Sequence, residues 1–287
     1  MGRLIVNADD FGLTAGVNRA IVELSRARAV TSATLMAGVT GTDNAIELAR
    51  AHSALGVGCH VVLLDGEPVL RPREIPTLID SQTGCFRRSL GGFLQKLLTE
   101  RIRPAEIEAE ATAQIALLQS KGLVLTHIDT HKHAHIFPAV LRPLLRAAAH
   151  CGIRAVRNPF EPTWSLKATH GAAWVRRAEV GLLRHLEPTF RRIVAEEGFT
   201  TTDGAIGLLA TGILDVAMIA SLLRKMPTGT WELVTHPGYN DADLALAHTR
   251  LLASRETERE ALLTLHQFPA VELISFADLT REASRQD

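Results

Sequence analysis

The stretch PAEIEAEATAQIALLQSKGLVLTHIDTHKHAH (residues 104–135) contains one complete unit of the fold. Its first half predicts a helix over Pro104–Lys121, because apolar residues recur at helical spacing and Gly122 follows as a stop. An apolar run then leads directly into a polar cluster rich in histidine. A helix followed by a buried strand that ends in polar residues is typical of parallel α/β proteins.

The same alternation continues along the chain. Apolar, β-rich runs predict strands at Arg3–Asn7, Ser32–Met36, Leu55–His60, Val124–Asp129, Ile153–Arg157, Ala205–Leu209, Trp231–Thr235 and Val271–Ile274. Further helices are predicted at Pro138–Cys151, Asp215–Met226 and Arg255–Gln267. We therefore expect a single-domain α/β fold, a (β/α) barrel-like arrangement of parallel strands with its active site at the C-terminal strand ends.

Two stretches interrupt this alternation. Residues 65–98 are rich in turn residues and are interpreted as a lid segment over the site. Residues 160–199 are interpreted as a helical insertion, rich in Trp and Arg. With no low-complexity linker and no internal repeat, we expect residues 1–287 to form one domain.

Composition excludes several classes of function. The chain of 287 residues carries 31 Lys+Arg and 31 Asp+Glu, so no overall charge favours nucleic acid. No apolar window is long enough for a transmembrane helix, and the start of the chain does not resemble a secretory signal. Three widely spaced cysteines suit reduced thiols. We expect a cytoplasmic protein, and a homodimer is the prior expectation for such a domain.

Polar residues collect where successive predicted strands end. Asp9 and Asp10 follow the first strand and His60 ends the third. The fourth strand leads into the cluster of His127, Asp129, His131, His133 and His135, and the fifth and seventh lead to Arg157 and His236. Histidine and aspartate are ligands for divalent metals, so this convergence indicates a metal-dependent hydrolytic centre.

The motifs NADDFG (residues 7–12), GCH (58–60) and HIDTHKH (127–133), in this order, resemble the YdjC-like (ChbG/HpnK) carbohydrate deacetylases. The resemblance extends from Leu4 to about Arg259. Its later segments, VRNPFEP (156–162) and WELVTHPGY (231–239), look most like the branch associated with hopanoid biosynthesis.

This resemblance implies one divalent metal ion held by Asp10, His60 and His131. It further implies Asp9 as general base and makes His236 the candidate general acid. Members of the family have a barrel-like fold and remove acetyl groups from N-acetylglucosamine-type sugars. For a site of aspartate and histidine we expect Mg or Zn, with Mn, Co or Ni as alternatives.

Each residue also has a plainer interpretation. The Asp9–Asp10 pair could be a helix N-cap, and His236 could simply occupy a turn before Pro and Gly. Asp129 is expected to hold a ligand imidazole rather than to bind metal. His127, His133 and His135 could support the site or contact sugar. Arg157 could orient Asp9, stabilise the oxyanion, or form a structural ion pair.

These residues favour a metal-dependent hydrolase that removes the N-acetyl group from an acetamido sugar or an N-acetylglucosaminyl glycoconjugate. A hopanoid glycolipid intermediate is one substrate class implied by the resemblance, and chito-oligosaccharides of the diacetylchitobiose type are the other. Two other hypotheses stay open. One is a metal-dependent hydrolase of another bond, such as a phosphoester, and the other is a non-catalytic metal-binding barrel.

Overall fold

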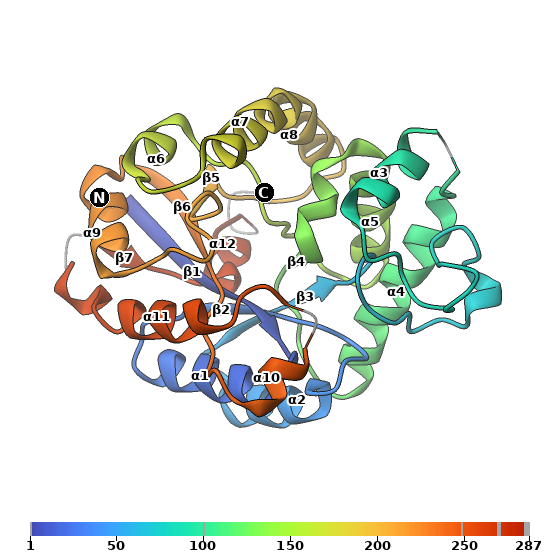
Figure 1. Ribbon diagram of the computed structural model, residues 1–287, viewed down its shortest axis with the longest axis horizontal. Helices are drawn as coiled ribbons and strands as arrows, with labels where there is room; N and C mark the ends of the chain where they lie inside the picture. The colour runs from blue at the N-terminus through green and yellow to red at the C-terminus, as the bar shows by residue number, and fades with distance from the viewer. Residues whose placement is uncertain (1, 100, 248, 269–270, 284–287) are drawn as a thin grey trace.

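Parallel strands form the centre of the protein (Figure 1). The computed structural model describes residues 2–99, 101–247, 249–268 and 271–283. Within these residues the strands are β1 (Gly2–Phe11), β2 (Ser32–Leu35), β3 (Gly56–Val61), β4 (Ile128–Thr130), β5 (Gly204–Ile206), β6 (Gly229–Thr235) and β7 (Val271–Leu273). They pair in the order β4-β3-β2-β1-β6-β5, and β7 pairs with the start of β1.

The two ends of this curled sheet are joined through residues 153–160. The Ile128 N–H donates to the Ala155 carbonyl (3.0 Å), while the Ala205 N–H donates to the Phe160 carbonyl (3.1 Å). Backbone hydrogen bonds therefore run from β4 through this segment to β5, which confirms the barrel-like α/β fold. All paired strands are parallel, so their C-terminal ends lie at one side of the sheet.

The predicted strand Ile153–Arg157 is formed only in part. Only isolated bridges occur there, one of them between Ile128 and Val156. The Arg157 N–H donates to the Ile128 carbonyl and the Val156 N–H to the Thr200 carbonyl (both 3.0 Å), so the segment is bonded on both sides without forming a continuous ladder.

The predicted strand Val124–Asp129 is also too long. β4 begins only at Ile128, and Val124 is 87% exposed. The residues before β4 bond to β3 only from Thr126 onward: the Thr126 N–H donates to the Val57 carbonyl (2.8 Å), and the Cys59 N–H donates to the His127 carbonyl (3.0 Å). Only the end of this apolar run therefore forms a buried strand.

Helices surround the sheet (Figure 1). They are α1 (Ala15–Arg26), α2 (Thr42–Ala51), α3 (Leu90–Leu98), α4 (Pro104–Ser120), α5 (Pro138–His150), α6 (Thr163–Ala168), α7 (Trp174–Leu183), α8 (Glu187–Glu196), α9 (Val216–Lys225), α10 (Ala242–Leu246), α11 (Ala253–Leu262) and α12 (Phe276–Ala283). The predicted apolar face of α4 is confirmed, because Ile107, Ala111, Ile115 and Leu118 are fully buried. None of the described helices has the length and apolar character that a membrane crossing requires.

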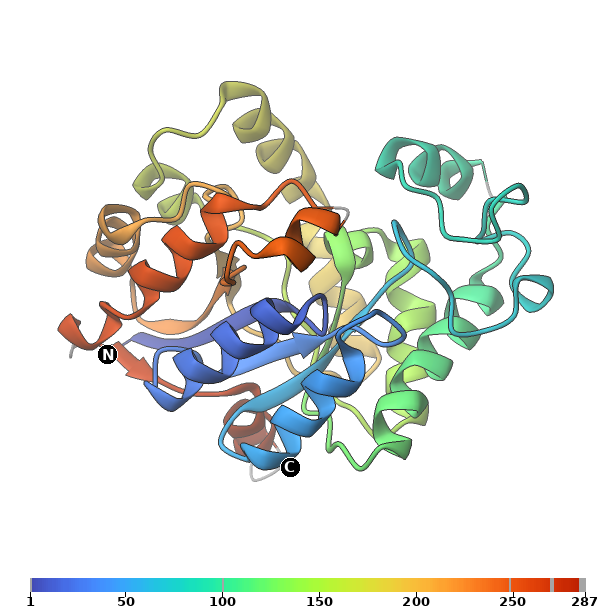
Figure 2. The same cartoon turned by 60° about the horizontal axis from the view of Figure 1, so that its bottom comes forward.

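Residues 65–98, predicted to be a lid, form a lobe beside α4 (Figure 2). Buried acids of α4 fix this lobe. Glu110 accepts hydrogen bonds from the backbone N–H groups of Val69 (2.8 Å) and Leu70 (3.0 Å), and Glu106 accepts two from Thr77 (both 2.7 Å). The first part of the lobe is therefore bonded to α4 through Val69, Leu70 and Thr77, and the function of residues 65–98 as a lid stays a prediction.

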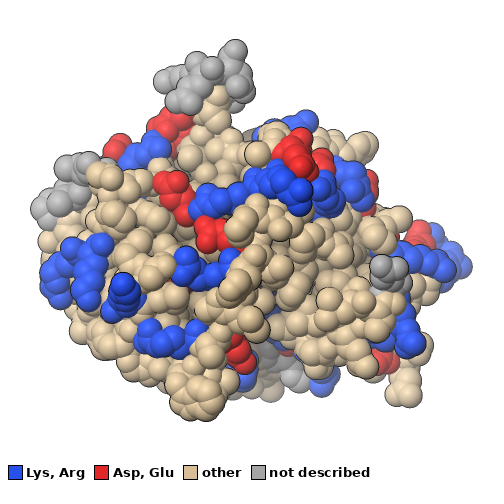
Figure 3. All heavy atoms as spheres, turned by 90° about the horizontal axis from the view of Figure 1, so that it is seen from above, with Lys and Arg blue, Asp and Glu red and all other residues tan. Residues whose placement is uncertain are grey.

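Residues 160–199 contain α6, α7 and α8, which lie above the sheet in Figure 1. None of the residues of α7 is buried. Figure 3 looks onto this side of the molecule, where basic side chains are spread over the surface and several lie beside acidic ones. Arg191 pairs with Glu187 (2.9 Å) and Arg142 with Glu196 (2.9 Å), so the charges on this face are mixed.

The anchoring of the lobe by Glu110 is testable. In the Glu110→Ala variant, the N–H groups of Val69 and Leu70 lose their acceptor, and we expect the free energy of unfolding to fall by about 2–4 kcal/mol. Chemical denaturation measures this change, and limited proteolysis should cut within residues 65–98.

Glu108→Ala is the matched control, since the Glu108 side chain makes only a surface ion pair with Arg146. Loss of this ion pair should change the free energy of unfolding by less than about 0.5 kcal/mol. Equal effects in both variants would contradict the anchoring role.

Candidate metal centre

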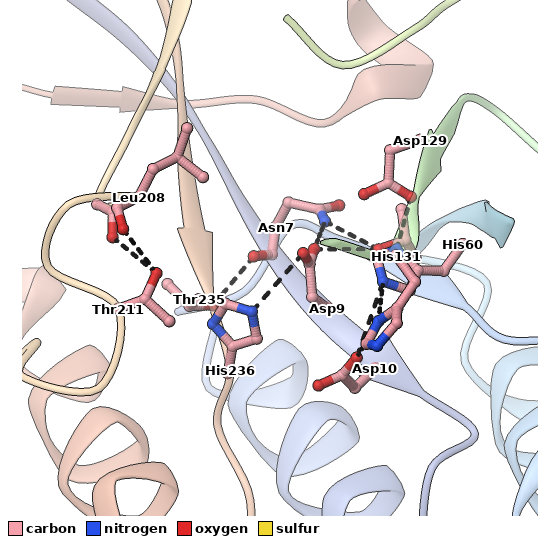
Figure 4. A network of polar contacts seen from close by, with 12 residues as sticks. Asn7, Asp9, Asp10, His60, Asp129, His131, Leu208, Thr211, Thr235 and His236 are labelled. Atoms are coloured by element: carbon pink, nitrogen blue, oxygen red, sulfur yellow. Dashed lines mark hydrogen bonds and ion pairs between the residues drawn. The ribbon is translucent and has the colours of Figure 1, made fainter. Parts of the chain in front are cut away.

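The end of β1 directs two adjacent acids toward one site. In a regular strand, neighbouring side chains point to opposite faces. Here the register between β1 and β2 shifts between Ala8 and Phe11, and Asp10 adopts a positive φ of 63°. This bulge lets Asp9 and Asp10 both face the C-terminal end of the sheet (Figure 4). The alternative interpretation of the pair as a plain helix N-cap is wrong, because Thr14 caps α1.

The side chains of Asp10, His60 and His131 form a triangle of potential ligand atoms. His60 Nε2 lies 3.2 Å from His131 Nδ1, and Asp10 Oδ1 lies 3.8 Å and 3.5 Å from these two nitrogens. Three ligands about 2.1 Å from one ion in tetrahedral geometry are about 3.4 Å apart. The triangle therefore fits a single divalent metal ion, held by two imidazoles and one carboxylate.

Asp129 supports His60 from the side away from this triangle. The His60 Nδ1–H donates to Asp129 Oδ1 (2.7 Å), which leaves the Nε2 lone pair directed at the triangle. Although burial alone would lower the pKa of His60, the carboxylates of Asp129, Asp9 and Asp10 raise it to about 9. The cluster thus favours a positive charge at this point, which a bound cation would provide.

Arg157 is fully buried and binds three carboxylates. Its guanidinium donates to both oxygens of Asp9 (2.6 and 2.8 Å), to Asp129, and through Nε to Glu232 (2.7 Å). Burial alone would raise the pKa of Asp9, but Arg157 holds it well below its usual range. Burial raises the pKa of Glu232 to about 8. Arg157 is therefore both a site residue and the centre of a structural ion network.

Asp9, His60 and Asp129 also lie close enough together to suggest a second metal site. However, Arg157 already binds Asp9 and Asp129, and a guanidinium and a metal ion would repel each other at this distance. The described residues thus offer one metal site, without the second site that a two-metal phosphoesterase would use.

His236 faces Asp9 from the end of β6 (Figure 4). Its Nε2 lies 3.8 Å from Asp9 Oδ2, and its ring is partly exposed. Burial lowers the pKa of His236 to about 4, so the imidazole is neutral near pH 7. Its backbone N–H donates to buried Glu258 (2.6 Å), which fixes the position of the residue.

The other histidines of the cluster differ in their surroundings. Fully buried His127 donates through Nε2 to Asn7 Oδ1 (3.1 Å), and Asn7 in turn donates to Asp9 (2.9 Å). His135 is likewise buried, between Thr130 and the Arg157 carbonyl. His133 has a positive φ of 54°, and its Nδ1 has no partner among the described residues. Only His133 of these three is exposed enough to meet a substrate.

Three buried charged residues of this site were not predicted from the sequence. Arg255 of α11 donates to Asp10 Oδ2 (2.5 Å), Glu258 on the same helix holds His236, and Glu232 of β6 binds Arg157. Arg255 and Glu258 lie in a polar helix, where charged residues normally face solvent. Glu232 interrupts the apolar run of a central strand, and this was the one available signal that it has a buried cationic partner.

The sequence is similar to those of known carbohydrate deacetylases. The chain is 33% identical to a carbohydrate deacetylase of Brevibacillus brevis, over 96% of this chain and 99% of that protein. It is 31% identical to a carbohydrate deacetylase of Mus musculus, over 83% of this chain and 78% of that protein. Neither name refers to hopanoids, so membership of the hopanoid-associated branch stays a prediction.

A solved structure has a similar fold. It comes from Enterococcus faecalis V583 and is described, provisionally, as a cellobiose-phosphate cleavage protein. It matches 97% of this chain and 98% of its own, with a TM-score of 0.71 and 23% identity. The family model for YdjC-like proteins matches residues 3–268, nearly the whole chain. The chain belongs to the YdjC-like protein family.

Proposed function

We propose that the protein is a metal-dependent carbohydrate N-deacetylase, which hydrolyses the acetamido group of an amino sugar to acetate and a free amine. The observation that carries this proposal is the triangle of Asp10, His60 and His131. Beside it lie Asp9 and His236, which are not among the proposed metal ligands. The names of the relatives agree with it. Amide hydrolysis needs these parts: an electrophilic metal, a base for water and a proton donor for the amine.

A divalent ion bound by the triangle would lower the pKa of a water molecule and withdraw charge from the acetyl carbonyl. In the reaction, the water oxygen attacks the acetyl carbon and the C–N bond breaks. One proton of the water must reach the departing nitrogen.

Asp9 and His236 provide a path for that proton. Arg157 keeps Asp9 ionised, so its carboxylate can accept a proton from water. Because its pKa is so low, Asp9 holds this proton only weakly, and neutral His236 lies 3.8 Å away. His236 accepts the proton and delivers it to the amine as the C–N bond breaks. His236 thus acts as the general acid only after Asp9 has acted as the base.

The metal ligands can be tested apart from catalysis. His131→Ala removes one corner of the triangle, and we expect its affinity for Zn²⁺ or Mn²⁺ to fall at least about 100-fold, more than for loss of a supporting residue. His133→Ala is the matched control on the same turn, and its affinity should stay within about threefold of the unmodified protein. Calorimetry on metal-free protein measures both. If His133→Ala lost the metal and His131→Ala kept it, the assigned ligand set would be wrong.

The proton path predicts loss of activity without loss of metal. We expect Asp9→Asn and His236→Gln each to lower kcat for acetate release by about 100- to 10,000-fold. Metal content, measured after dialysis, should stay at that of the unmodified protein, and circular dichroism should show a folded chain. Undiminished acetate release by Asp9→Asn would exclude Asp9 as the base.

The substrate class is open to a direct screen. We expect the metal-loaded protein to release acetate from N-acetylglucosamine, from diacetylchitobiose or from an N-acetylglucosaminyl lipid, and the relative kcat/KM values identify the substrate class. Removal of the metal with a chelator should abolish release, and adding the metal back should restore it. Hydrolysis of a phosphoester with no acetate release from any of the three would support the rival hydrolase instead.

A further inference from the structure

Asp10 uses its two carboxylate oxygens for different partners. Oδ1 faces the triangle, 3.5 Å from His131 Nδ1 and 3.8 Å from His60 Nε2. Oδ2 accepts a hydrogen bond from Arg255 Nη2 at 2.5 Å. An aspartate that binds a metal through both oxygens occupies two coordination positions, whereas one that binds through a single oxygen occupies one.

Arg255 is itself held in place. It is fully buried, and its Nε donates to the Leu251 carbonyl (3.0 Å). Its Nη1 approaches the His236 carbonyl at 3.5 Å. Gly238 leaves room for the arginine stem, because a Cβ at that position would lie 3.0 Å from Arg255 Cδ. The guanidinium therefore cannot swing away from Asp10 without disturbing α11.

The backbone of Asp10 also needs this support. A positive φ of 63° is uncommon for a residue other than glycine, and the surrounding structure must stabilise it. A charge-assisted hydrogen bond from a buried arginine fixes both the side chain and its direction.

We infer that Arg255 is a positioning residue that restricts Asp10 to a single ligand oxygen and so keeps a coordination position of the metal free for water and substrate. This inference rests on the proposed metal site. It assigns α11 a specific function in the reaction: Arg255 sets the coordination of Asp10, and Glu258, one turn later, holds the backbone of His236 (2.6 Å).

The test uses Co²⁺ as a spectroscopic probe of the protein. In Arg255→Met, Asp10 Oδ2 is free to bind the ion. We expect the visible absorption of the Co²⁺ form to weaken as the coordination number rises, and kcat to fall about 10- to 100-fold. Affinity for Co²⁺ should be equal or higher, because a positive charge beside the ligand is gone. Arg255→Lys, which keeps a donor, should recover the original spectrum in part.

A merely structural role for Arg255 gives another pattern: weaker Co²⁺ binding with an unchanged spectrum would overturn the inference. Glu258→Gln is the matched control on the same helix, and its Co²⁺ spectrum should equal that of the unmodified protein. If the unmodified protein bound no divalent metal, the proposed metal site itself would fail, which is a separate result.

The unmodified protein gives an independent measurement, which does not depend on whether Arg255→Met folds. Infrared difference spectra of the metal-loaded and metal-free protein report the splitting between the two carboxylate stretching bands. We expect the wide splitting of a carboxylate bound through one oxygen. A narrow splitting, typical of binding through both oxygens, would contradict the inference.

Discussion

The buried ion network of Arg157 is the interaction on which the site depends. One guanidinium binds Asp9 of β1, Asp129 of β4 and Glu232 of β6. It therefore ties strands from opposite parts of the curled sheet to a single point. Charges buried this deeply are tolerated only when they are paired and hydrogen bonded, so loss of Arg157 would leave its carboxylates uncompensated. The network is also what orients the supporting partner of His60 and the proposed base.

The adjacent acids Asp9 and Asp10 have different surroundings, because a different arginine binds each of them. Arg157 binds both oxygens of Asp9, so a metal ion at Asp9 would lie beside the guanidinium charge and be repelled. Arg255 binds only one oxygen of Asp10 and leaves the other directed at His60 and His131. The bulge at the end of β1 makes this separation possible, because it turns both side chains toward the site. Sequence adjacency alone does not distinguish the two acids.

The sequence predicted the parts of the molecule that follow from a repeating pattern. The β/α alternation predicted the parallel barrel-like sheet, and helical spacing of apolar residues predicted the buried face of α4. The triangle joins residues that the family resemblance named, which lie fifty or more positions apart in the chain. Arg255 was not predicted, because a charged residue on a polar helix normally faces solvent. Only the packing of α11 beside α9 and α1, which brings Arg255 to Asp10, buries it. Val124 was wrongly predicted to begin a strand, since an apolar run does not reveal where pairing with a neighbouring strand begins.

We propose that one divalent ion binds between Asp10, His60 and His131, beside an arginine network that excludes it from Asp9 and Asp129. Anomalous diffraction from crystals of the metal-loaded protein tests this claim most directly. We expect a single peak about 2.0–2.3 Å from Asp10 Oδ1, His60 Nε2 and His131 Nδ1, with Arg157 still bound to Asp9. A peak between Asp9 and Asp129, with Arg157 displaced, would contradict it.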